Sequence, residues 1–238
     1  MKLIGYLSLG YLTIKDTFDV AKIYVENGVD VLEIDFPAKN PFLDSPFIQN
    51  RMIKALEACS DYDKYMVAIT EIQKKYPRQE IFILAYEQTI EQIGVEKFAK
   101  FMESHKLTEL IYVGGNNLKI KETLKAHGIK LAQYVPLHLP EADLEASRTS
   151  NGFIYLQAKS DKAHSHYKTL GEVIAYLRKN EAKNKRIMCG VGVSTVEDVK
   201  RVKDAGADGA FIGSTFLKLQ NDVPALKAKI KEFKAATK

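Results

Sequence analysis

The chain has 238 residues, of which 46% are hydrophobic and 27% charged, a composition too apolar for a disordered chain. Its longest uncharged stretch, Leu3–Ile14, is too short to span a bilayer, and its two cysteines, Cys59 and Cys189, cannot form a disulfide framework, which indicates a reducing, cytoplasmic setting. The formal net charge of +5 is spread along the chain without an aromatic–basic stacking pattern, so neither a nucleic acid nor a membrane is expected as a partner.

Short apolar runs alternate with helical patterns from one end of the chain to the other. The short runs are dense in Ile, Val, Leu, Tyr and Phe, which predicts strands buried on both faces, as in a parallel sheet. In chain order, the eight predicted strands are Leu3–Leu9, Asp30–Phe36, Ile81–Tyr86, Glu109–Val113, Lys130–Val135, Gly152–Gln157, Arg186–Cys189 and Gly209–Ile212.

Helical periodicity fills the gaps between these strands. After the first strand, the apolar residues from Ile14 to Val25 follow helical spacing, and Gly28 ends the pattern. Residues 47–76 predict two helices that break near Ser60. The other predicted helices are Val95–Ser104, Leu118–His127, Ala142–Arg148, Leu170–Lys179, Thr195–Ala205 and Pro224–Ala235.

Glycine recurs between a helix and the following strand in residues 26–33, 126–131 and 204–210, which is a weak internal repeat. No linker rich in glycine, serine or proline divides the chain. Eight uninterrupted β–α units predict one domain over residues 1–238, folded as an α/β protein of the closed (β/α)8 TIM barrel type. An open doubly wound sheet is the alternative, but its dinucleotide fingerprint needs several glycines after the first strand, where only Gly10 occurs.

Two glycine turns follow the seventh and eighth predicted strands, at the barrel end where function is expected. Gly190 and Gly192 stand in the first turn, Gly213 and Ser214 in the second, and each turn opens a helical segment. Glycine lets backbone N–H groups approach an anion closely, and helix N-termini carry partial positive charge. Barrels often bind phosphate between these two loops, so the pair predicts a phosphate-ester ligand, with plain structural turns as the alternative.

The second predicted strand carries two carboxylates on one face, Glu33 and Asp35. An acid inside a barrel is costly to bury unless it is functional or paired, and enclosure raises its pKa into the range useful for proton transfer. The residues alone leave open which face of the strand points inward. The proline-stiffened loop 37–46 follows and carries Asp44, which is either a positioned functional acid or the N-cap of the next helix.

Residues Asp30–Asn50 resemble the motif L-E-x-G-x-P-F-S-D-P-x-x-D-G-P-x-I-Q of the tryptophan synthase α subunit family. The resemblance extends from Leu3 to the last helix and implies a (β/α)8 barrel lyase of tryptophan biosynthesis, which cleaves indole-3-glycerol phosphate to indole and glyceraldehyde 3-phosphate. Further blocks that resemble the family are Leu84-Ala85-Tyr86, Gly152-Phe153-Ile154-Tyr155, Gly190-Val191-Gly192 and the stretch from Ala207 to Ser214.

The resemblance implies roles for individual positions. Glu33 matches the family's catalytic general acid and base, which selects it over Asp35, and Asp44 matches the aspartate that holds the indole N–H. The resemblance also implies a β subunit as a partner and no cofactor. The positions that match the substrate-binding pocket and its phosphate cradle are Tyr86, Tyr155, Gly190, Gly192, Gly213 and Ser214.

Several segments depart from the family pattern. Asp35 replaces the glycine of L-E-x-G, and residues 37–41 read P-A-K-N-P in place of P-F-S-D-P. Residues 113–117 replace D-x-P after strand four, and residues 160–166 replace the G-V-T-G lid after strand six. These changes keep two alternatives open: an isomerase or aldolase acting on another sugar phosphate, and a binding subunit that has lost catalysis.

Three other signals are weaker. His164 and His166 stand in the altered sixth loop, but zinc needs three or four ligands and no third is near in sequence, so we expect no metal site. Lys39 and Lys159 are candidates for contact with a phosphate or carboxylate, although most lysines only solvate a surface. Cys189 ends a predicted core strand, where a small apolar filler is expected.

Overall fold

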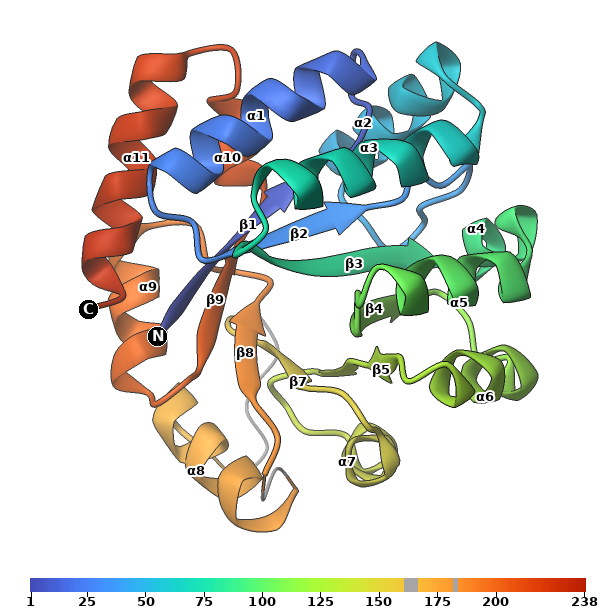
Figure 1. The fold of residues 1–238 in the computed structure, drawn as a ribbon. Coiled ribbons are helices and arrows are strands. Elements are labelled where there is room, and N and C mark those ends of the chain that lie inside the picture. The colour runs from blue at the N-terminus through green and yellow to red at the C-terminus, as the bar shows by residue number, and fades with distance from the viewer. Residues whose placement is uncertain (161–166, 182–183) are drawn as a thin grey trace.

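The computed structural model describes residues 1–160, 167–181 and 184–238. The described residues form one nine-stranded sheet in which every neighbouring pair is parallel, in the order β5-β4-β3-β2-β1-β9-β8-β7-β6. Helices surround the strands, and the two chain ends lie close together (Figure 1). The amino group of Met1 donates to the Thr237 carbonyl oxygen at 3.3 Å, which ties the ends to each other.

Every predicted strand is present, with ends that differ by no more than two residues. The fifth predicted strand is interrupted at Ala132 and forms two short strands, β5 and β6. The observed strands are β1 (Lys2–Leu7), β2 (Val31–Asp35), β3 (Glu80–Tyr86), β4 (Glu109–Val113), β5 (Lys130–Leu131), β6 (Gln133–Val135), β7 (Ile154–Gln157), β8 (Ile187–Gly190) and β9 (Gly209–Ile212).

The predicted helices are also present, and a short α4 (Glu87–Ile93) directly after β3 was not expected. Within the described residues, no helix has the length and apolarity required to cross a membrane. The remaining helices are α1 (Ile14–Glu26), α2 (Pro46–Ala58), α3 (Tyr62–Lys75), α5 (Val95–Ser104), α6 (Leu118–Ala126), α7 (Glu141–Thr149), α8 (Leu170–Asn180), α9 (Val196–Asp204), α10 (Ser214–Lys218) and α11 (Val223–Ala236).

The break in the fifth strand is where the sheet closes on itself. The Ala132 N–H donates to the Leu110 carbonyl oxygen on β4, and the next N–H, of Gln133, donates to the Phe153 carbonyl oxygen beside β7, both at 2.9 Å. A Cβ on Gly152 would lie 2.3 Å from the Leu131 carbonyl oxygen, so glycine allows this close approach. The single-residue interruption therefore completes a ring, which confirms the TIM barrel and excludes the open doubly wound sheet.

Aromatic side chains fill the barrel interior below the carboxyl ends of the strands. Phe153 stacks on Phe82 and on Phe211, with ring centroids 5.2 and 6.0 Å apart, and Tyr155 stacks on Phe211 at 4.5 Å. A second core lies between the outer strand faces and the helices, because alternate residues of each strand point outward. The packed interior leaves room for a ligand at the carboxyl end of the strands.

An ion network closes the opposite, amino-terminal end of the barrel. Arg186 donates to Glu80 at 2.9 Å and to Glu109 at 2.6 Å, and its guanidinium lies 5.3 Å from the centroid of the Phe82 ring. Lys2 forms a further ion pair with Glu80. The charges at this end are therefore matched by partners and cover the aromatic interior.

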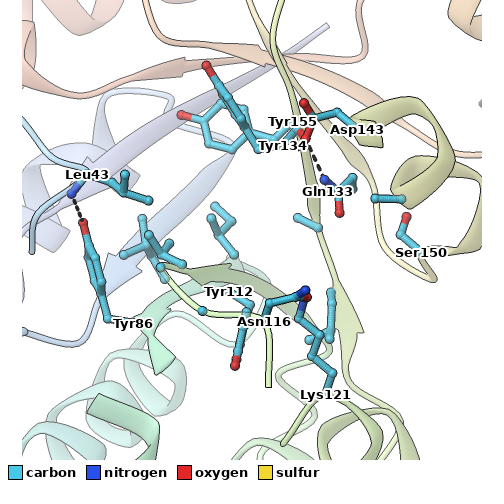
Figure 2. Close-up of a pocket in the computed structure, with 18 of the residues that line it drawn as sticks. Leu43, Tyr86, Tyr112, Asn116, Lys121, Gln133, Tyr134, Asp143, Ser150 and Tyr155 are labelled. Carbon is cyan, nitrogen blue, oxygen red and sulfur yellow. Dashed lines mark hydrogen bonds between the residues drawn. The ribbon is translucent and has the colours of Figure 1, made fainter. Parts of the chain in front are cut away.

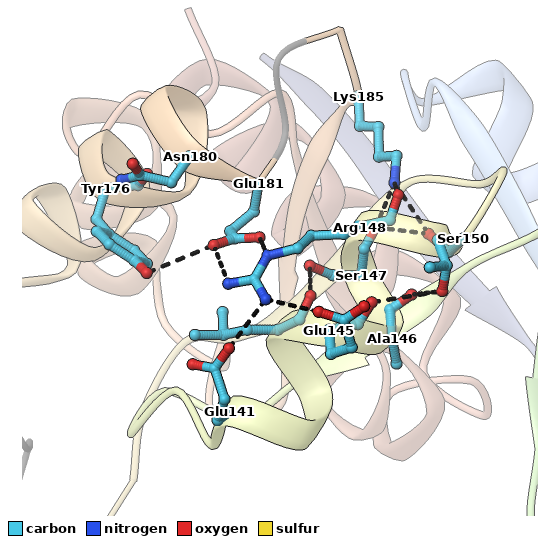
Figure 3. A network of polar contacts seen from close by, with 12 residues as sticks. Glu141, Glu145, Ala146, Ser147, Arg148, Ser150, Tyr176, Asn180, Glu181 and Lys185 are labelled. Carbon is cyan, nitrogen blue, oxygen red and sulfur yellow. Dashed lines mark hydrogen bonds and ion pairs between the residues drawn. The ribbon is translucent and has the colours of Figure 1, made fainter.

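A second polar network fixes α7 to the end of α8. Figure 3 shows Arg148 of α7 at its centre. Its guanidinium pairs with Glu181 at 2.7 Å, Glu141 at 2.9 Å and Glu145 at 2.8 Å. Glu181 is buried, so its charge depends on this partner, and the network holds the wall that α7 supplies to the barrel mouth.

Candidate functional site

The carboxylate-bearing face of β2 turns into the barrel. Glu33 is in register with Tyr6 on β1 and Phe82 on β3, and both of these side chains belong to the interior cluster. Asp35, two residues further along β2, has the same orientation. Glu33 is 3% exposed and Asp35 is 0% exposed. The structure therefore settles what the sequence left open, because both acids point inward.

The two inward acids differ in their partners. The Tyr6 hydroxyl donates to Asp35 Oδ2 at 2.8 Å, and the Leu9 N–H donates to Asp35 Oδ1 at 2.6 Å. Burial raises the pKa of Asp35 to about 7, although both hydrogen bonds act to lower it. Glu33 receives no hydrogen bond from the described residues. Burial, followed by the charges of Asp44 and Asp35, raises the pKa of Glu33 well above its usual range.

Asp44 approaches the same region from the loop after β2. The Tyr86 hydroxyl donates to Asp44 Oδ2 at 2.6 Å and accepts a hydrogen bond from the Leu43 N–H at 3.3 Å. Burial raises the pKa of Asp44, and the hydrogen bond from Tyr86 opposes that rise. Ser45, whose hydroxyl accepts from the Ile48 N–H, is the N-cap of α2. The alternative reading of Asp44 as the helix cap is therefore wrong.

A cavity of about 880 Å³ opens at the carboxyl end of the barrel. Asp44, Tyr86 and Tyr155 line it together with apolar side chains of β3 and β4, and Figure 2 shows the two tyrosines at different sides of the space. Glu33 is not among the described residues that line the cavity. It lies near Tyr155, whose pKa is raised by burial and next by the charge of Glu33. The structure thus brings Asp44, Tyr86 and Tyr155 together around one cavity, with Glu33 beside Tyr155.

Both glycines of the turn after β8 have close neighbours. A Cβ on Gly190 would lie 2.2 Å from the Tyr155 ring, so a side chain there would displace this aromatic from the cavity wall. Gly192 adopts a φ of 94°, in the left-handed region, and a Cβ there would lie 2.6 Å from Lys159 Cβ. Val191 between them lines the cavity. Gly190 therefore makes room for the pocket, and Gly192 shapes the turn.

The turn after β9 lies against the turn after β8. The Thr215 hydroxyl donates to the Ser194 carbonyl oxygen at 3.1 Å, which joins the two turns directly. Ser214 begins α10, and the first N–H groups of a helix have no acceptor within the helix. Gly213 precedes it without a side chain. The predicted phosphate-binding turns are thus adjacent, as a shared anion site requires.

The N-terminus of α9 is already occupied by a carboxylate. Asp198 accepts hydrogen bonds from the Ser194 N–H at 3.0 Å and the Thr195 N–H at 3.1 Å, and it forms an ion pair with Lys159. Burial acts to raise the pKa of Asp198, but the hydrogen bonds from Lys159 and the two N–H groups lower it to about 2. Two N–H groups at the start of α9 are therefore engaged within the protein, and the contribution of this helix N-terminus to a phosphate site stays a prediction.

Sequence reasoning missed part of the cavity lining. Tyr112, Lys121, Gln133 and Tyr134 all line the cavity, but none stands in a motif. They cluster around the break at Ala132, and the wall opens there because of long-range strand pairing, which leaves no local signal.

Within the described ranges, no three His, Cys, Asp or Glu side chains are placed to hold a metal ion. His164 and His166, the weak metal pair of the sequence, lie outside those ranges. Cys189 is buried, and burial raises the pKa of its thiol to about 12, as expected for a core residue.

Comparison with known proteins identifies the family. A family model described as tryptophan synthase alpha chain matches residues 1–238. The tryptophan synthase alpha chain of Methanosarcina mazei is 28% identical over 91% of this chain and 80% of that protein, and the one of Methanosarcina barkeri is 27% identical over 99% and 91%. Aminoacrylate-bound tryptophan synthase from M. tuberculosis shares the fold, with a TM-score of 0.84 at 22% identity, covering 100% of this chain and 93% of that one. The chain therefore belongs to the tryptophan synthase alpha chain family.

Proposed function

We propose that this chain cleaves indole-3-glycerol phosphate to indole and glyceraldehyde 3-phosphate, the known lyase activity of alpha chains in its family. The observation that carries the proposal is the environment of Glu33, a buried carboxyl group with no hydrogen bond from the described residues. A second carboxyl group, Asp44, lines the adjoining cavity. Two carboxyl groups in different surroundings can divide proton transfer and charge stabilisation between them.

The reaction breaks the bond between indole carbon 3 and the hydroxyl-bearing carbon of the side chain. Carbon 3 gains a proton, the hydroxyl loses one, and the bonding electron pair returns to the ring as the aldehyde forms. One carboxyl group that starts protonated serves both steps, because it gives its proton to carbon 3 and then takes the hydroxyl proton. Glu33 suits this role because burial raises its pKa, which favours the protonated form as the substrate binds.

Asp44 suits the second role, at the ring nitrogen. Protonation at carbon 3 places positive charge on that nitrogen, where a carboxylate stabilises it most directly. Tyr86 holds Asp44 Oδ2 and favours the ionised form, while Oδ1 has no hydrogen bond among the described residues and is free for the indole N–H.

Glu33 is 3% exposed and lies beside Tyr155, which lines the cavity, and its side chain has no hydrogen bond to break in the described structure as it meets the substrate. Asp35 is the less suitable acid, because Tyr6 and Leu9 hold both of its oxygens.

The phosphate group is proposed to bind at the joined turns after β8 and β9. Gly192, Gly213 and Ser214 bring backbone N–H groups to this place, and Lys159, which is paired with Asp198, lies beside Gly192. Gly190 contributes by leaving space for Tyr155.

A partner polypeptide is proposed to cover the mouth, and the family makes a tryptophan synthase β subunit the expected one. The rim exposes large apolar side chains: Phe42 is 53% exposed, Leu43 66% and Leu118 68%. Leu43 and Leu118 also line the cavity, so exposed apolar side chains stand at its opening. Exposed large apolar side chains at one place are typical of protein interfaces.

The test is release of indole from indole-3-glycerol phosphate by the purified chain, alone and with a β subunit. We expect turnover in both cases and faster turnover with the β subunit. Turnover of a different sugar phosphate in its place would favour an isomerase or aldolase. Calorimetric binding of phosphate esters without any turnover would favour a non-catalytic binding subunit.

A further inference from the structure

The barrel closes at Ala132, but its wall opens between β4 and β6 toward the carboxyl ends of these strands. The pairing between β4 and β5 ends at the hydrogen bond that the Ala132 N–H donates to the Leu110 carbonyl oxygen. Beyond that point β6 pairs with β7, and the last residues of β4 pair with β3, but β4 and β6 do not pair with each other in the described sheet. The two strands therefore separate toward their carboxyl ends.

The cavity at the mouth continues through this gap. Its lining includes Ile111 and Tyr155 from the interior and also Tyr112, which packs with the outer core. Residues of α6 and α7, the helices that flank the gap, line it as well (Figure 2). We call the part beyond the wall the side pocket, and its lining includes Tyr112, Leu118, Lys121, Gln133, Ala146 and Ser150.

The side pocket contains an ammonium group without a carboxylate partner among the described residues. Lys121 donates to Asn116 at 2.8 Å and lies 5.3 Å from the centroid of the Tyr112 ring. The nearby Glu87 carboxylate is engaged elsewhere, because it accepts hydrogen bonds from the Tyr112 hydroxyl and the Asn117 N–H. Lys121 can therefore accept an anionic group at this end of the side pocket.

A single acid lines the α7 side of this space in the described structure. Asp143 is partly buried, and burial raises its pKa, which favours the neutral form. Figure 2 shows Asp143 beside Tyr134, on the other side of Gln133 from Lys121. Lys121 and Lys125 of α6, which both line the cavity, give this end of the side pocket its positive charge.

We propose that the side pocket receives a substituent on the benzene part of the substrate's indole ring, and that Lys121 selects an anionic substituent such as a carboxylate. The inference rests on the proposed function, because it takes the indole N–H to face Asp44. Figure 2 shows Leu43 and Tyr86, which contact Asp44, on one side of the cavity and Lys121 and Ser150 on the other. A ring whose N–H faces Asp44 presents carbon 5 to the opposite side.

The size of the cavity agrees with a larger ligand. Its volume of about 880 Å³ lies near the upper end of the ~300–1,000 Å³ range of small-molecule pockets. The parent substrate has no group to place beyond the wall, whereas a 5-carboxylate reaches toward Lys121. The network around Arg148 holds α7 in place, so the far wall of the pocket is preformed.

The experiment compares kcat/KM for indole-3-glycerol phosphate, its 5-carboxylate and its 5-carboxamide. We expect turnover of all three, and Lys121→Met to lower the ratio of carboxylate to parent about tenfold, the effect of losing one partly exposed charge-assisted hydrogen bond. The carboxamide ratio should change less than about twofold. Lys119→Met removes an exposed lysine from the same helix outside the cavity lining and should leave both ratios unchanged.

The outcomes separate the inference from the proposed function. Absence of parent turnover would contradict the proposed function itself. Parent turnover without turnover of the carboxylate would overturn the side-pocket inference alone. Equal loss of the ratio in Lys121→Met and Lys119→Met would show a general effect of net charge and would also overturn it. Parent turnover in each variant reports that the variant has folded.

Discussion

The two ends of the barrel use carboxylates in opposite ways. At the amino-terminal end, Glu80 and Glu109 share the guanidinium of Arg186. At the carboxyl end, Glu33 and Asp44 form no ion pair with the described residues, and burial raises the pKa of each. The same residue type therefore closes the barrel at one end, and at the other end it is kept ready to exchange a proton or to meet a ligand.

The two ends also show that a cationic partner alone does not set the protonation state of a carboxyl group. Burial acts to raise the pKa of Glu80, but the hydrogen bonds from Lys2 and Arg186 lower it overall. Burial raises the pKa of Glu109 despite Arg186, and Glu109 Oε2 has no hydrogen-bond partner in the described structure. At both ends, burial raises the pKa of a carboxyl group and pairing with a cation lowers it. Only at the mouth are the carboxyl groups deeply buried with other acids as their nearest charges.

The largest expected effect comes from Glu33, the unpaired acid of the mouth. Glu33→Gln should lower kcat for indole release about thousandfold, because the amide can neither give nor take the proton. The melting temperature should not fall, since the substitution removes a buried ionisable group that has no partner to lose. Activity within about tenfold of the parent chain would contradict the assignment of Glu33 as acid and base.

The pH dependence of the free energy of unfolding tests the protonation state of Asp35, the second inward acid of the mouth. The pKa of Asp35 is about 7 in the folded chain, which is above its value in the unfolded chain. Asp35 therefore contributes fully to the free energy of unfolding below about pH 4, and this contribution is lost as the pH rises to about 7. Asp35→Asn does not ionise, and its unfolding free energy relative to the parent chain should rise by about 4 kcal/mol across that interval. Urea unfolding of both chains at several pH values measures this difference. A pH-independent difference would show that Asp35 is ionised in the folded protein.

Substitutions of Asp44 and of its partner Tyr86 test charge stabilisation apart from proton transfer. Asp44→Asn should lower kcat/KM about fiftyfold, because the neutral amide no longer stabilises the charged ring nitrogen. Tyr86→Phe removes the hydroxyl that positions Asp44 and should have a smaller effect of about tenfold. If Tyr86→Phe is the more damaging of the two, Tyr86 acts on the substrate directly and not through Asp44.

The smallest expected effect concerns the amino-terminal end. Arg186→Met should lower the free energy of unfolding by about 1.5 kcal/mol, because the buried Glu109 then keeps only the more distant Lys130 as a cation, 3.9 Å away; partial exposure of Arg186 moderates the loss. Glu109→Gln in the same chain should recover part of it. Turnover per folded molecule should stay the same, and a large loss of kcat without a loss of stability would contradict the division between the two ends.

Most of the fold was predictable because buried parallel strands appear in the sequence as dense apolar runs. The interruption at Ala132 was not predictable, since Lys130–Val135 looks continuous and the break depends on Gly152 approaching a neighbouring strand. The inward orientation of Glu33 depends on register, which only the paired strands of the folded barrel define.

The candidate site was predictable in part, and the parts came from different sources. Glu33 and Asp44 were selected by their resemblance to a family motif, and their roles remain predictions. The role of Asp198 at the start of α9 and the opening toward Lys121 were not foreseen, because both depend on contacts between distant segments. Ser45 rather than Asp44 caps α2, a choice between neighbouring polar residues that propensity does not resolve.

The central claim is that Glu33 keeps its proton to a higher pH than Asp44 in the folded chain. Carbon-13 NMR of the side-chain carboxyl groups measures this directly, with Glu33→Gln and Asp44→Asn used to assign the two signals. We predict that the Glu33 signal stays in its protonated position at neutral pH, after the Asp44 signal has moved to its ionised position. Ionisation of Glu33 at the pH of an ordinary exposed glutamate would contradict the account.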